Sequence, residues 1–562
     1  MSSRRLLCVE SIMRLLMDED DDGALEELSD SETEDTELVD NVEGDNQSEE
    51  SSLLSGDEDI HEGVSGALMD DVPGLATPSA SNELSSGNDP SILAFSSSTI
   101  RSRSRHVWVT RKGRTSNRTA AINIVRGARG PTRAVKDIVD PLMLFEQFIT
   151  NQIVDEILKW TNLEIEMKRQ NYESISSTQK NTSKEEIRAL LGIMVLTAAL
   201  KDNHLTLTLD ELFSSEYCGT RYVSCMSKDR CEFLLLCLRF DDRAVRLQRQ
   251  INDPFTPIRD IWEMLIVQCR QNYVPRTNVT VEEQLLAFRG RCKFRMYIPN
   301  KPDKYGVKLK MMCVPYLGKV TNTGGMPFGE YFVKELTRCI HGTNRNVTMD
   351  NWFTSIPLAK QLLQQPYKLI ILGTLRSNKR EIPEEMKNKK KSNRNNQTTE
   401  VNASRKVNTS MFVYDGPLTL LSFIPKPSKM VYMLSSCDEE ASVNPDNKKP
   451  RMIEFYNSTK GGVDTFDQMC SVMSWSRETN RWPMCVFYGM MNVACINSYI
   501  LYCHNVSVQG EKILPRRDFM MKLHSQLVEP WLKIRHEIRT MPTHTKNKIT
   551  EILFPNNDEN QG

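Results

Sequence analysis

Three separate segments of the sequence place carboxylates in a turn or at the expected end of a strand. They are Glu282 and Glu283 in TVEEQ, Asp350 in TMDNW, and Asp464 and Asp467 in KGGVDTFDQM. Carboxylates gathered from separate segments suit hard divalent cations. Two Mg²⁺ ions roughly 3.5–4 Å apart would activate a water or a 3′-hydroxyl for attack on a phosphodiester. The chain has 73 acidic residues, and each of them can instead be a cap, a turn residue or half of a salt bridge.

The segments around these carboxylates are predicted to alternate between strands and helices. From Asn278 onward, short β-branched or apolar runs are separated by Gly, Pro and Asn, which is typical of strands; they are NVTVEEQLLAF, VKLKMMCV, RNVTMDNWF and YKLIILGTL. SIPLAKQLLQQ is predicted to be a helix capped by Ser355. Asp464 and Asp467 are three residues apart, so a helix would point both to one side. The centre of the chain is therefore expected to be α/β.

Both flanks of this centre are predicted to be helical. Apolar residues recur at spacings of three and four after Lys136, and Ser183 with Glu186 forms a capping box ahead of IRALLGIMVLTAAL. The stretch from about Arg477 to Pro555 is also expected to be helical. Its most apolar run, Cys485–Cys503, contains asparagines and is interpreted as a buried helix rather than a membrane span, so no membrane partner is expected.

Charge is distributed very unevenly along the chain. Residues 1–90 hold 26 acids and 3 bases, and the remaining residues hold 47 acids and 69 bases. Residues 1–100 are therefore predicted to be a disordered acidic tail. Ten bases and no acid follow between Arg101 and Arg133, including Arg111, Lys112 and Arg114. This arm is interpreted as a phosphate-binding and nuclear-import segment, with a solvated basic linker as the alternative.

The cysteines favour an intracellular protein. The 14 cysteines are scattered singly through apolar stretches and form no C-x-x-C pair. The N-terminus lacks a continuous apolar region and a small-residue cleavage site, so it is not interpreted as a secretory leader. Together with the basic arm, this predicts a nuclear protein.

Four long blocks of the sequence resemble consecutive signature blocks of piggyBac transposases. They are VTVEEQLLAFRGRCKFRMYIPNKPDKYGVKLKMMC, NVTMDNWFTSIPLAKQLL, LGTLRSNKREIPEEM and YNSTKGGVDTFDQMCSVMSWSRETNRWPM. The resemblance extends from about Ile100 to Pro555. It implies an α/β RNase H-like catalytic core with a β-rich insertion, flanked by a helical dimerisation and DNA-binding domain. It also implies a homodimer that cuts and pastes double-stranded DNA, acting on transposon ends and TTAA targets with an Asp triad and Mg²⁺ or Mn²⁺.

The resemblance also implies roles for individual residues. Asp350 matches the second catalytic aspartate, Asp464 the third, and Asp467 an accompanying acid, while Glu282 stands where the family has its first aspartate. The residues expected to hold the metal are therefore Glu282, Asp350 and Asp464.

Three further residues match positions outside the acidic triad. Arg376 and Lys379 in RSNKR match basic residues implicated in DNA contact, and Trp482 in NRWPM matches an aromatic close to the active site. With the arm residues Arg111, Lys112 and Arg114, they form the expected set of DNA-binding residues.

The expected organisation has six parts. Residues 1–100 are the acidic tail, 101–135 the basic arm, 136–277 the first part of the helical domain, 278–475 the catalytic domain with its insertion at about 377–450, 476–555 the second helical part, and 556–562 a tail.

The sequence departs from the family pattern at three places. Glu282 has a carboxylate about 1.5 Å further from the backbone than an aspartate. About ten residues are missing at Val314–Pro315, where the family has a turn and much of the third core strand. Their loss is expected to expose an edge or force re-pairing near Glu282. No Cys/His-rich module is expected near the C-terminus, because the histidines there are isolated, so no zinc is predicted.

These departures leave three interpretations of function. The favoured one is a catalytically impaired transposase derivative that still binds DNA. The alternatives are an active metal-dependent transposase and a decayed copy of the element without function.

Overall fold

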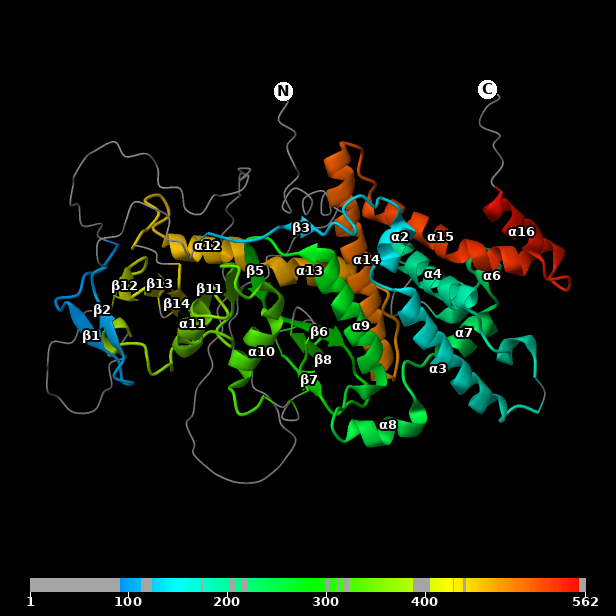
Figure 1. Ribbon diagram of the computed structural model, residues 1–562, viewed down its shortest axis with the longest axis horizontal. Coiled ribbons are helices and arrows are strands. Elements are labelled where there is room, and N and C mark those ends of the chain that lie inside the picture. The colour runs from blue at the N-terminus through cyan, green and yellow to red at the C-terminus, as the bar shows by residue number, and fades with distance from the viewer. Residues whose placement is uncertain are drawn as a thin grey trace.

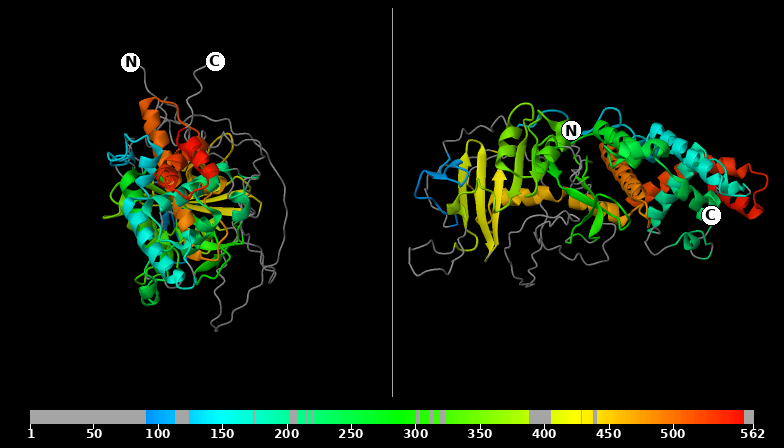
Figure 2. Two further views of the ribbon diagram at one scale, coloured as in Figure 1. Left: turned by 90° about the vertical axis from the view of Figure 1, so that its right-hand side faces the viewer. Right: turned by 90° about the horizontal axis from the view of Figure 1, so that it is seen from below.

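The computed structural model describes residues 91–112 and 124–554, with gaps at 174, 202–207, 215, 217, 219, 300, 302, 311–313, 318–320, 322, 388–404, 428 and 438–440. Arg114, the tail residues 556–562 and nearly all of the acidic tail lie outside the described residues. The molecule is elongated, with the main sheet at one end and a group of helices at the other (Figures 1 and 2).

The helical end is built from two segments that are far apart in sequence. The first supplies α2 (Pro141–Glu146), α3 (Asn151–Arg169), α4 (Lys184–Leu200), α5 (Leu209–Leu212), α6 (Arg221–Cys225), α7 (Lys228–Cys237), α8 (Arg243–Gln250) and α9 (Thr256–Asn272). The second supplies α14 (Trp482–Gln509), α15 (Arg516–His536) and α16 (Thr543–Leu553). Buried apolar residues from both segments form one continuous core. Gly192 lets α15 approach α4, since a Cβ there would lie 2.6 Å from Cγ1 of Val528.

The main sheet of the described residues has eight strands, in the order β1-β2-β12-β13-β14-β11-β10-β5. Their bounds are β1 Thr99–Arg101, β2 Val107–Val109, β5 Asn278–Val281, β10 Asn346–Met349, β11 Ile370–Leu375, β12 Ser410–Asp415, β13 Leu418–Lys426 and β14 Lys429–Ser435. Strands β5, β10 and β11 run parallel, and the remaining pairs are antiparallel.

Helices cover both faces of this sheet. One face packs on α10 (Phe328–Leu336) and α11 (Ile356–Leu363), whose buried residues share a core with Val347 and Met349 of β10. The other face packs on α12 (Arg451–Lys460), whose Met452 shares a smaller core with Leu372 and Met433. Helix α13 (Gly462–Val472) continues from α12 and packs against β5. The sheet therefore lies between helical layers, as the α/β prediction requires.

A smaller sheet begins one residue after β5. It contains β6 (Glu283–Ala287), β7 (Arg295–Tyr297), β8 (Tyr305–Lys310) and β9 (Val314–Pro315). Strand β8 pairs with β6 on one side, and with β7 and the two-residue β9 on the other. The β6–β8 register is continuous over Glu283–Ala287, so β6 keeps its partner beside Glu282, and the strand at the gap, β9, is two residues long.

The basic segment after residue 98 contributes to the sheet, which its composition did not suggest. Strands β1 and β2 form a hairpin on the edge of β12, and the Trp108 side chain is fully buried. Its Nε1 donates a hydrogen bond of 2.9 Å to the carbonyl of Glu381. Residues 124–140 then run along the molecule to α2 (Figure 1). Arg345 anchors them: it is buried, and its guanidinium donates to the carbonyls of Arg126 and Ala128.

Helix α14 contains the apolar run that was interpreted as a buried helix. Among the described residues it is the helix whose length and composition would allow it to cross a membrane, and 83% of its most apolar window is buried within the protein. Its contacts are those of a core helix.

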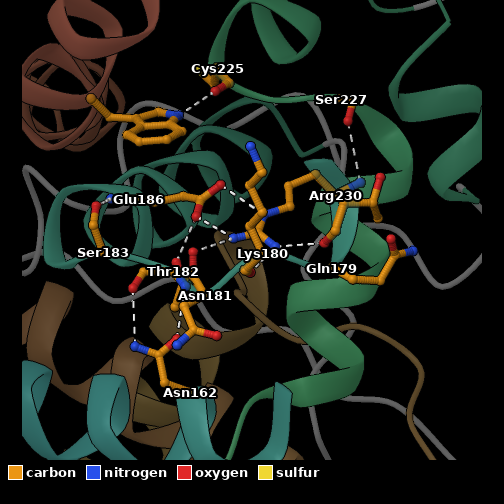
Figure 3. A network of polar contacts seen from close by, with 12 residues as sticks. Asn162, Gln179, Lys180, Asn181, Thr182, Ser183, Glu186, Cys225, Ser227 and Arg230 are labelled. Atoms are coloured by element: carbon orange, nitrogen blue, oxygen red, sulfur yellow. Dashed lines mark hydrogen bonds and ion pairs between the residues drawn. The ribbon is translucent and has the colours of Figure 1, made fainter. Parts of the chain in front are cut away.

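A buried ion pair ties α7 to the start of α4. Arg230 donates to both carboxylate oxygens of Glu186, at 2.9 and 2.6 Å, and to the carbonyls of Thr178 and Lys180 (Figure 3). Thr182 donates to the same carboxylate at 2.7 Å. This network fixes the turn that leads into α4.

We expect Arg230→Met to lower the free energy of unfolding by about 3–5 kcal/mol, because it leaves the Glu186 carboxylate buried without its cation. Urea unfolding followed by circular dichroism measures the loss. The control is Lys184→Ala, which removes an exposed ion pair with Asp155 and is expected to cost at most about 1 kcal/mol. Equal losses in the two variants would contradict a structural role for the buried pair.

Candidate active site

Glu282 occupies the point where one strand changes its pairing partner. It follows Val281 of β5, which pairs in parallel with β10, and precedes Glu283 of β6, which pairs antiparallel with β8. Successive side chains of a strand point to opposite faces, so Glu282 and Glu283 face different surroundings. Glu283 accepts from Lys308 Nζ at 2.7 Å and Lys310 Nζ at 2.5 Å. Its carboxylate is therefore engaged in a buried ion pair.

Asp350 lies beside Glu282 because of strand register. Met349 pairs with Val281, so the next residues of the two parallel strands, Asp350 and Glu282, stand at the same edge of the sheet. The Asp350 carboxylate accepts from the backbone N–H groups of Trp352 at 3.0 Å and Phe353 at 3.4 Å. These bonds fix the orientation of the Asp350 side chain.

Helix α13 carries Asp464 and Asp467 next to the same edge, because it packs against β5 and β6. Gly462 allows this close approach, since a Cβ there would lie 3.2 Å from Oγ1 of Thr280. The two aspartates are one helical turn apart, as predicted. Gln284 of β6 lies near Asp467 and favours its charged form, which lowers the pKa of that carboxyl.

Electrostatics place these acids in one neighbourhood. Burial raises the pKa of Glu282 to about 8, and repulsion from Asp464 and Asp350 adds to this shift. Burial, followed by repulsion from Glu283, raises the pKa of Asp350 to about 6. Because each negative charge disfavours the others, the cluster favours a bound proton or a cation.

Asp467 shows the same effect. Burial raises its pKa to about 6, and Asp464 adds to the shift, while the Lys301 ammonium opposes it. Lys301 likewise opposes the shift at Glu282, so its ammonium favours the charged form of both carboxylates.

The carboxylate oxygens of the candidate acids suit a hard divalent cation, although these side chains do not surround a common metal position. Within the described ranges, no group of three or more His, Cys, Asp or Glu side chains has the arrangement of a metal site. Carboxylate oxygens are the donors Mg²⁺ prefers, at roughly 2.0–2.1 Å. Asp467 Oδ1 is buried without a hydrogen-bond partner, so this oxygen could coordinate a cation. Glu282, Asp350 and Asp464 fit a cation by chemistry, with side-chain movement needed to reach ligating distance.

Two of the predicted DNA-binding residues, Arg376 and Lys379, lie in a turn that contacts the residue after Asp350, and the third, Trp482, packs against two phenylalanine rings. Arg376 directly follows β11, is exposed, and donates from Nε to the side-chain oxygen of Asn351 at 3.1 Å. Lys379 lies in the same turn. Trp482 begins α14, half-buried against the rings of Phe255 and Phe294, with centroid distances of 5.6 and 5.0 Å.

The arm residues Arg111 and Lys112 are not brought to the acidic edge. They follow β2, which is six strand positions from β5 in the sheet, or roughly 30 Å at the usual strand spacing. Both are near the surface at the opposite edge. Their predicted role therefore concerns a different part of the molecule.

A row of exposed cations after the end of β6 was missed as a group. Arg289, Arg291, Lys293 and Arg295 are exposed in the loop and strand after β6. They alternate with the buried Phe288 and Phe294 and the half-buried Cys292, and this alternation of basic and apolar residues in FRGRCKFR could have identified them.

Comparisons with known proteins identify the class of protein to which the chain belongs. The family model described as Transposase IS4 matches residues 140–499, which include all four candidate acids. A solved structure of piggyBac transposase, a synaptic complex with hairpin DNA, is 52% identical with a TM-score of 0.71 and covers 78% of this chain and 90% of its own. The human PiggyBac transposable element-derived protein 3 is 22% identical over 365 residues, 61% of this chain. This chain spans 58% of that curated relative's length.

The chain belongs to the piggyBac transposase family. The resemblance drawn from the sequence blocks is thus confirmed, and so is the expectation of an α/β transposase core.

The turn after Asp350 depends on a glycine in the neighbouring strand. Gly373 of β11 pairs with Met349, and a Cβ there would collide with Oγ1 of Thr354 and lie 2.8 Å from the carbonyl of Met349. We expect Gly373→Ala to destabilise the protein by about 1–3 kcal/mol, as overpacking does. Gly461→Ala, where a Cβ meets nothing within 4 Å, is the matched control and is expected to be close to neutral. Urea unfolding compares the two, and equal effects would contradict the packing argument.

Proposed function

We propose that this protein is a DNA-binding derivative of a piggyBac-type transposase whose metal-dependent cleavage and strand transfer at TTAA sites are impaired. The observation that carries the proposal is the parallel register that puts Glu282 and Asp350 at one sheet edge, beside Asp464 on α13. The relative that is 52% identical is a transposase in a synaptic complex with hairpin DNA. Double-stranded DNA, in the form of transposon ends and target sites, is therefore the partner we propose.

The proposed domain organisation follows from the same relationship. β5 with β6, β8, β10 and β11 would form the RNase H-like core, and β12–β14 would belong to the β-rich insertion at about 377–450. The helices of 136–277 and 476–555 share one core, which supports a single dimerisation and DNA-binding domain. We propose that it acts as a homodimer in the nucleus.

In this proposal Glu282, Asp350 and Asp464 hold Mg²⁺ or Mn²⁺, and Asp467 assists. The metal, when bound, supplies an activated water or 3′-hydroxyl and stabilises the leaving oxygen. Asp350 presents a carboxylate already fixed by two backbone N–H groups. Glu282 presents a carboxylate that is one carbon too long. A misplacement of about 1 Å can cost on the order of a hundredfold in rate, which is the reason we propose impairment.

Cleavage of labelled duplex DNA carrying a TTAA flank and the element's terminal repeats tests this proposal. We expect little cleavage by the wild-type protein with Mg²⁺ or Mn²⁺, and about a 10–100-fold increase for Glu282→Asp, because the shorter side chain restores the geometry. EDTA and Asp350→Ala, in the Glu282→Asp background, should abolish cleavage.

Cleavage, together with measurements of unfolding and DNA binding, separates the alternatives. Efficient wild-type cleavage that Glu282→Asp does not improve would favour an active transposase. A protein that neither unfolds cooperatively nor shifts DNA would favour a decayed copy.

Two cations near the acidic edge are proposed to bind DNA phosphates. We expect Arg376→Ala and Lys379→Ala each to weaken duplex binding and to reduce the slope of log affinity against log salt by about one, because each removes one phosphate contact. Fluorescence anisotropy at several salt concentrations measures both quantities. Lys360→Ala, which removes a surface cation paired with Asp415, is the control and should change neither. Unchanged slopes in the first two variants would rule out their proposed contacts.

A further inference from the structure

Lys310 is a lysine whose charge is enclosed by the protein. Its side chain is 0% exposed, and its Nζ lies 2.5 Å from Oε2 of Glu283. Four aromatic rings surround the ammonium: Trp352 at 3.5 Å from Nζ to the ring centroid, Phe353 at 4.7 Å, Tyr316 at 5.5 Å and Phe332 at 5.9 Å. Lys310, Glu283 and these four rings are called the Lys310 cage below. A desolvated cation gains substantially from such rings, so the ammonium is held at a defined place.

The cage shares two residues with the Asp350 turn. Trp352 and Phe353 offer their rings to the Lys310 ammonium, and their backbone N–H groups bind the Asp350 carboxylate. Any movement of these two residues away from Lys310 therefore moves the donors that orient Asp350.

The Lys310 cage is also connected to Glu282, through the adjacent residue Glu283. Glu283 is the covalent neighbour of Glu282, and its carboxylate is fixed by Lys310 from β8. Lys310 thus contacts the segment that carries Glu282 and the turn that carries Asp350. The parallel register sets the two backbones side by side, and the cage sets the position of the turn beyond them.

We propose that Lys310 is a positioning residue for the acidic centre, holding the Asp350 turn against the start of β6 so that Asp350 and Glu282 face the same cation. This inference rests on the proposed function for the role of the cation. The placement of the turn by Lys310 is a separate claim that can be tested without metal or DNA.

A neighbouring lysine provides the matched control. Lys308 also binds Glu283, at 2.7 Å, and is also buried. Its Nζ lies 5.8 Å from the Tyr316 ring, whereas Lys310 Nζ lies 3.5 Å from the Trp352 ring. Lys308→Met therefore removes a cation from the same carboxylate while keeping the Lys310 ammonium among the Trp352 and Phe353 rings.

The first measurement is hydrogen exchange of the peptide containing residues 350–354 in the full chain. We expect Lys310→Met to speed exchange of the Trp352 and Phe353 amides at least tenfold, Lys310→Arg to preserve protection because it keeps a cation among the rings, and Lys308→Met to leave these amides unchanged. Thermal unfolding of each variant shows whether the whole fold is weakened. Wild-type exchange in Lys310→Met, or equal acceleration in Lys308→Met, would overturn the positioning role.

The second measurement is Mn²⁺ titration followed by electron paramagnetic resonance, with no DNA present. We expect Lys310→Met to weaken Mn²⁺ binding about 10–100-fold, the range seen when residues that orient metal ligands are removed, and Lys310→Arg to restore most of it. Mn²⁺ affinity equal to wild type in Lys310→Met would overturn the link to the cation. If the wild-type protein binds no Mn²⁺ that Asp350→Ala abolishes, the proposed metal site fails, and hydrogen exchange alone then decides the positioning of the turn.

Discussion

Repulsion between desolvated carboxylates is the constraint that the sheet half of the molecule must satisfy. Parallel pairing of Val281 with Met349 forces Glu282 and Asp350 to the same edge, and α13 adds Asp464 close by. Burial raises the pKa of both carboxyls, and repulsion adds to the shift, from Asp464 and Asp350 at Glu282 and from Glu283 at Asp350. The fold therefore carries an electrostatic cost there unless a proton or cation is present. Lys301 and Lys310 offset part of that cost, since each favours the charged form of a nearby acid.

Lys301 and Lys310 reduce the carboxylate repulsion from different environments. Lys301 is half-buried and opposes the pKa shifts of Glu282 and Asp467. Lys310 is fully enclosed, and burial lowers its pKa to about 8, with Glu283 opposing that shift. A buried cation of this kind adds little net stability compared with an apolar side chain. What it supplies is a fixed position, because the ion pair and the rings restrict the ammonium to one place.

The acidic residues of the candidate site were predicted from the sequence, while the geometry that brings them together was not. Carboxylates after predicted strands, together with the family blocks, identified the acidic residues. The roles of Glu282 and Glu283 could not be separated from TVEEQ alone. The residues that each side chain faces depend on strand pairing between distant segments. The burial of Trp108 could not be predicted from its basic segment for a similar reason. Its Nε1 donates to the carbonyl of Glu381, which is 273 residues away in the sequence. The hairpin-like runs of β12–β14 were visible, but their continuation of the same sheet follows from non-local pairing.

If Glu282 occupies the place of the family's first aspartate, as the sequence blocks imply, its longer side chain must be accommodated near the site. Asp350 cannot easily move, because two N–H groups and the Lys310 cage hold its turn. The backbone at Glu282 is less constrained: this residue lies between β5 and β6, outside the paired registers of both sheets. A shift of about 1.5 Å, the length of one carbon–carbon bond, is therefore most readily accommodated at this break in the strand. Glu282 lies at this break, whereas two backbone N–H groups hold the Asp350 carboxylate, and the impairment we propose follows from that difference, because Mg²⁺ requires near-octahedral geometry.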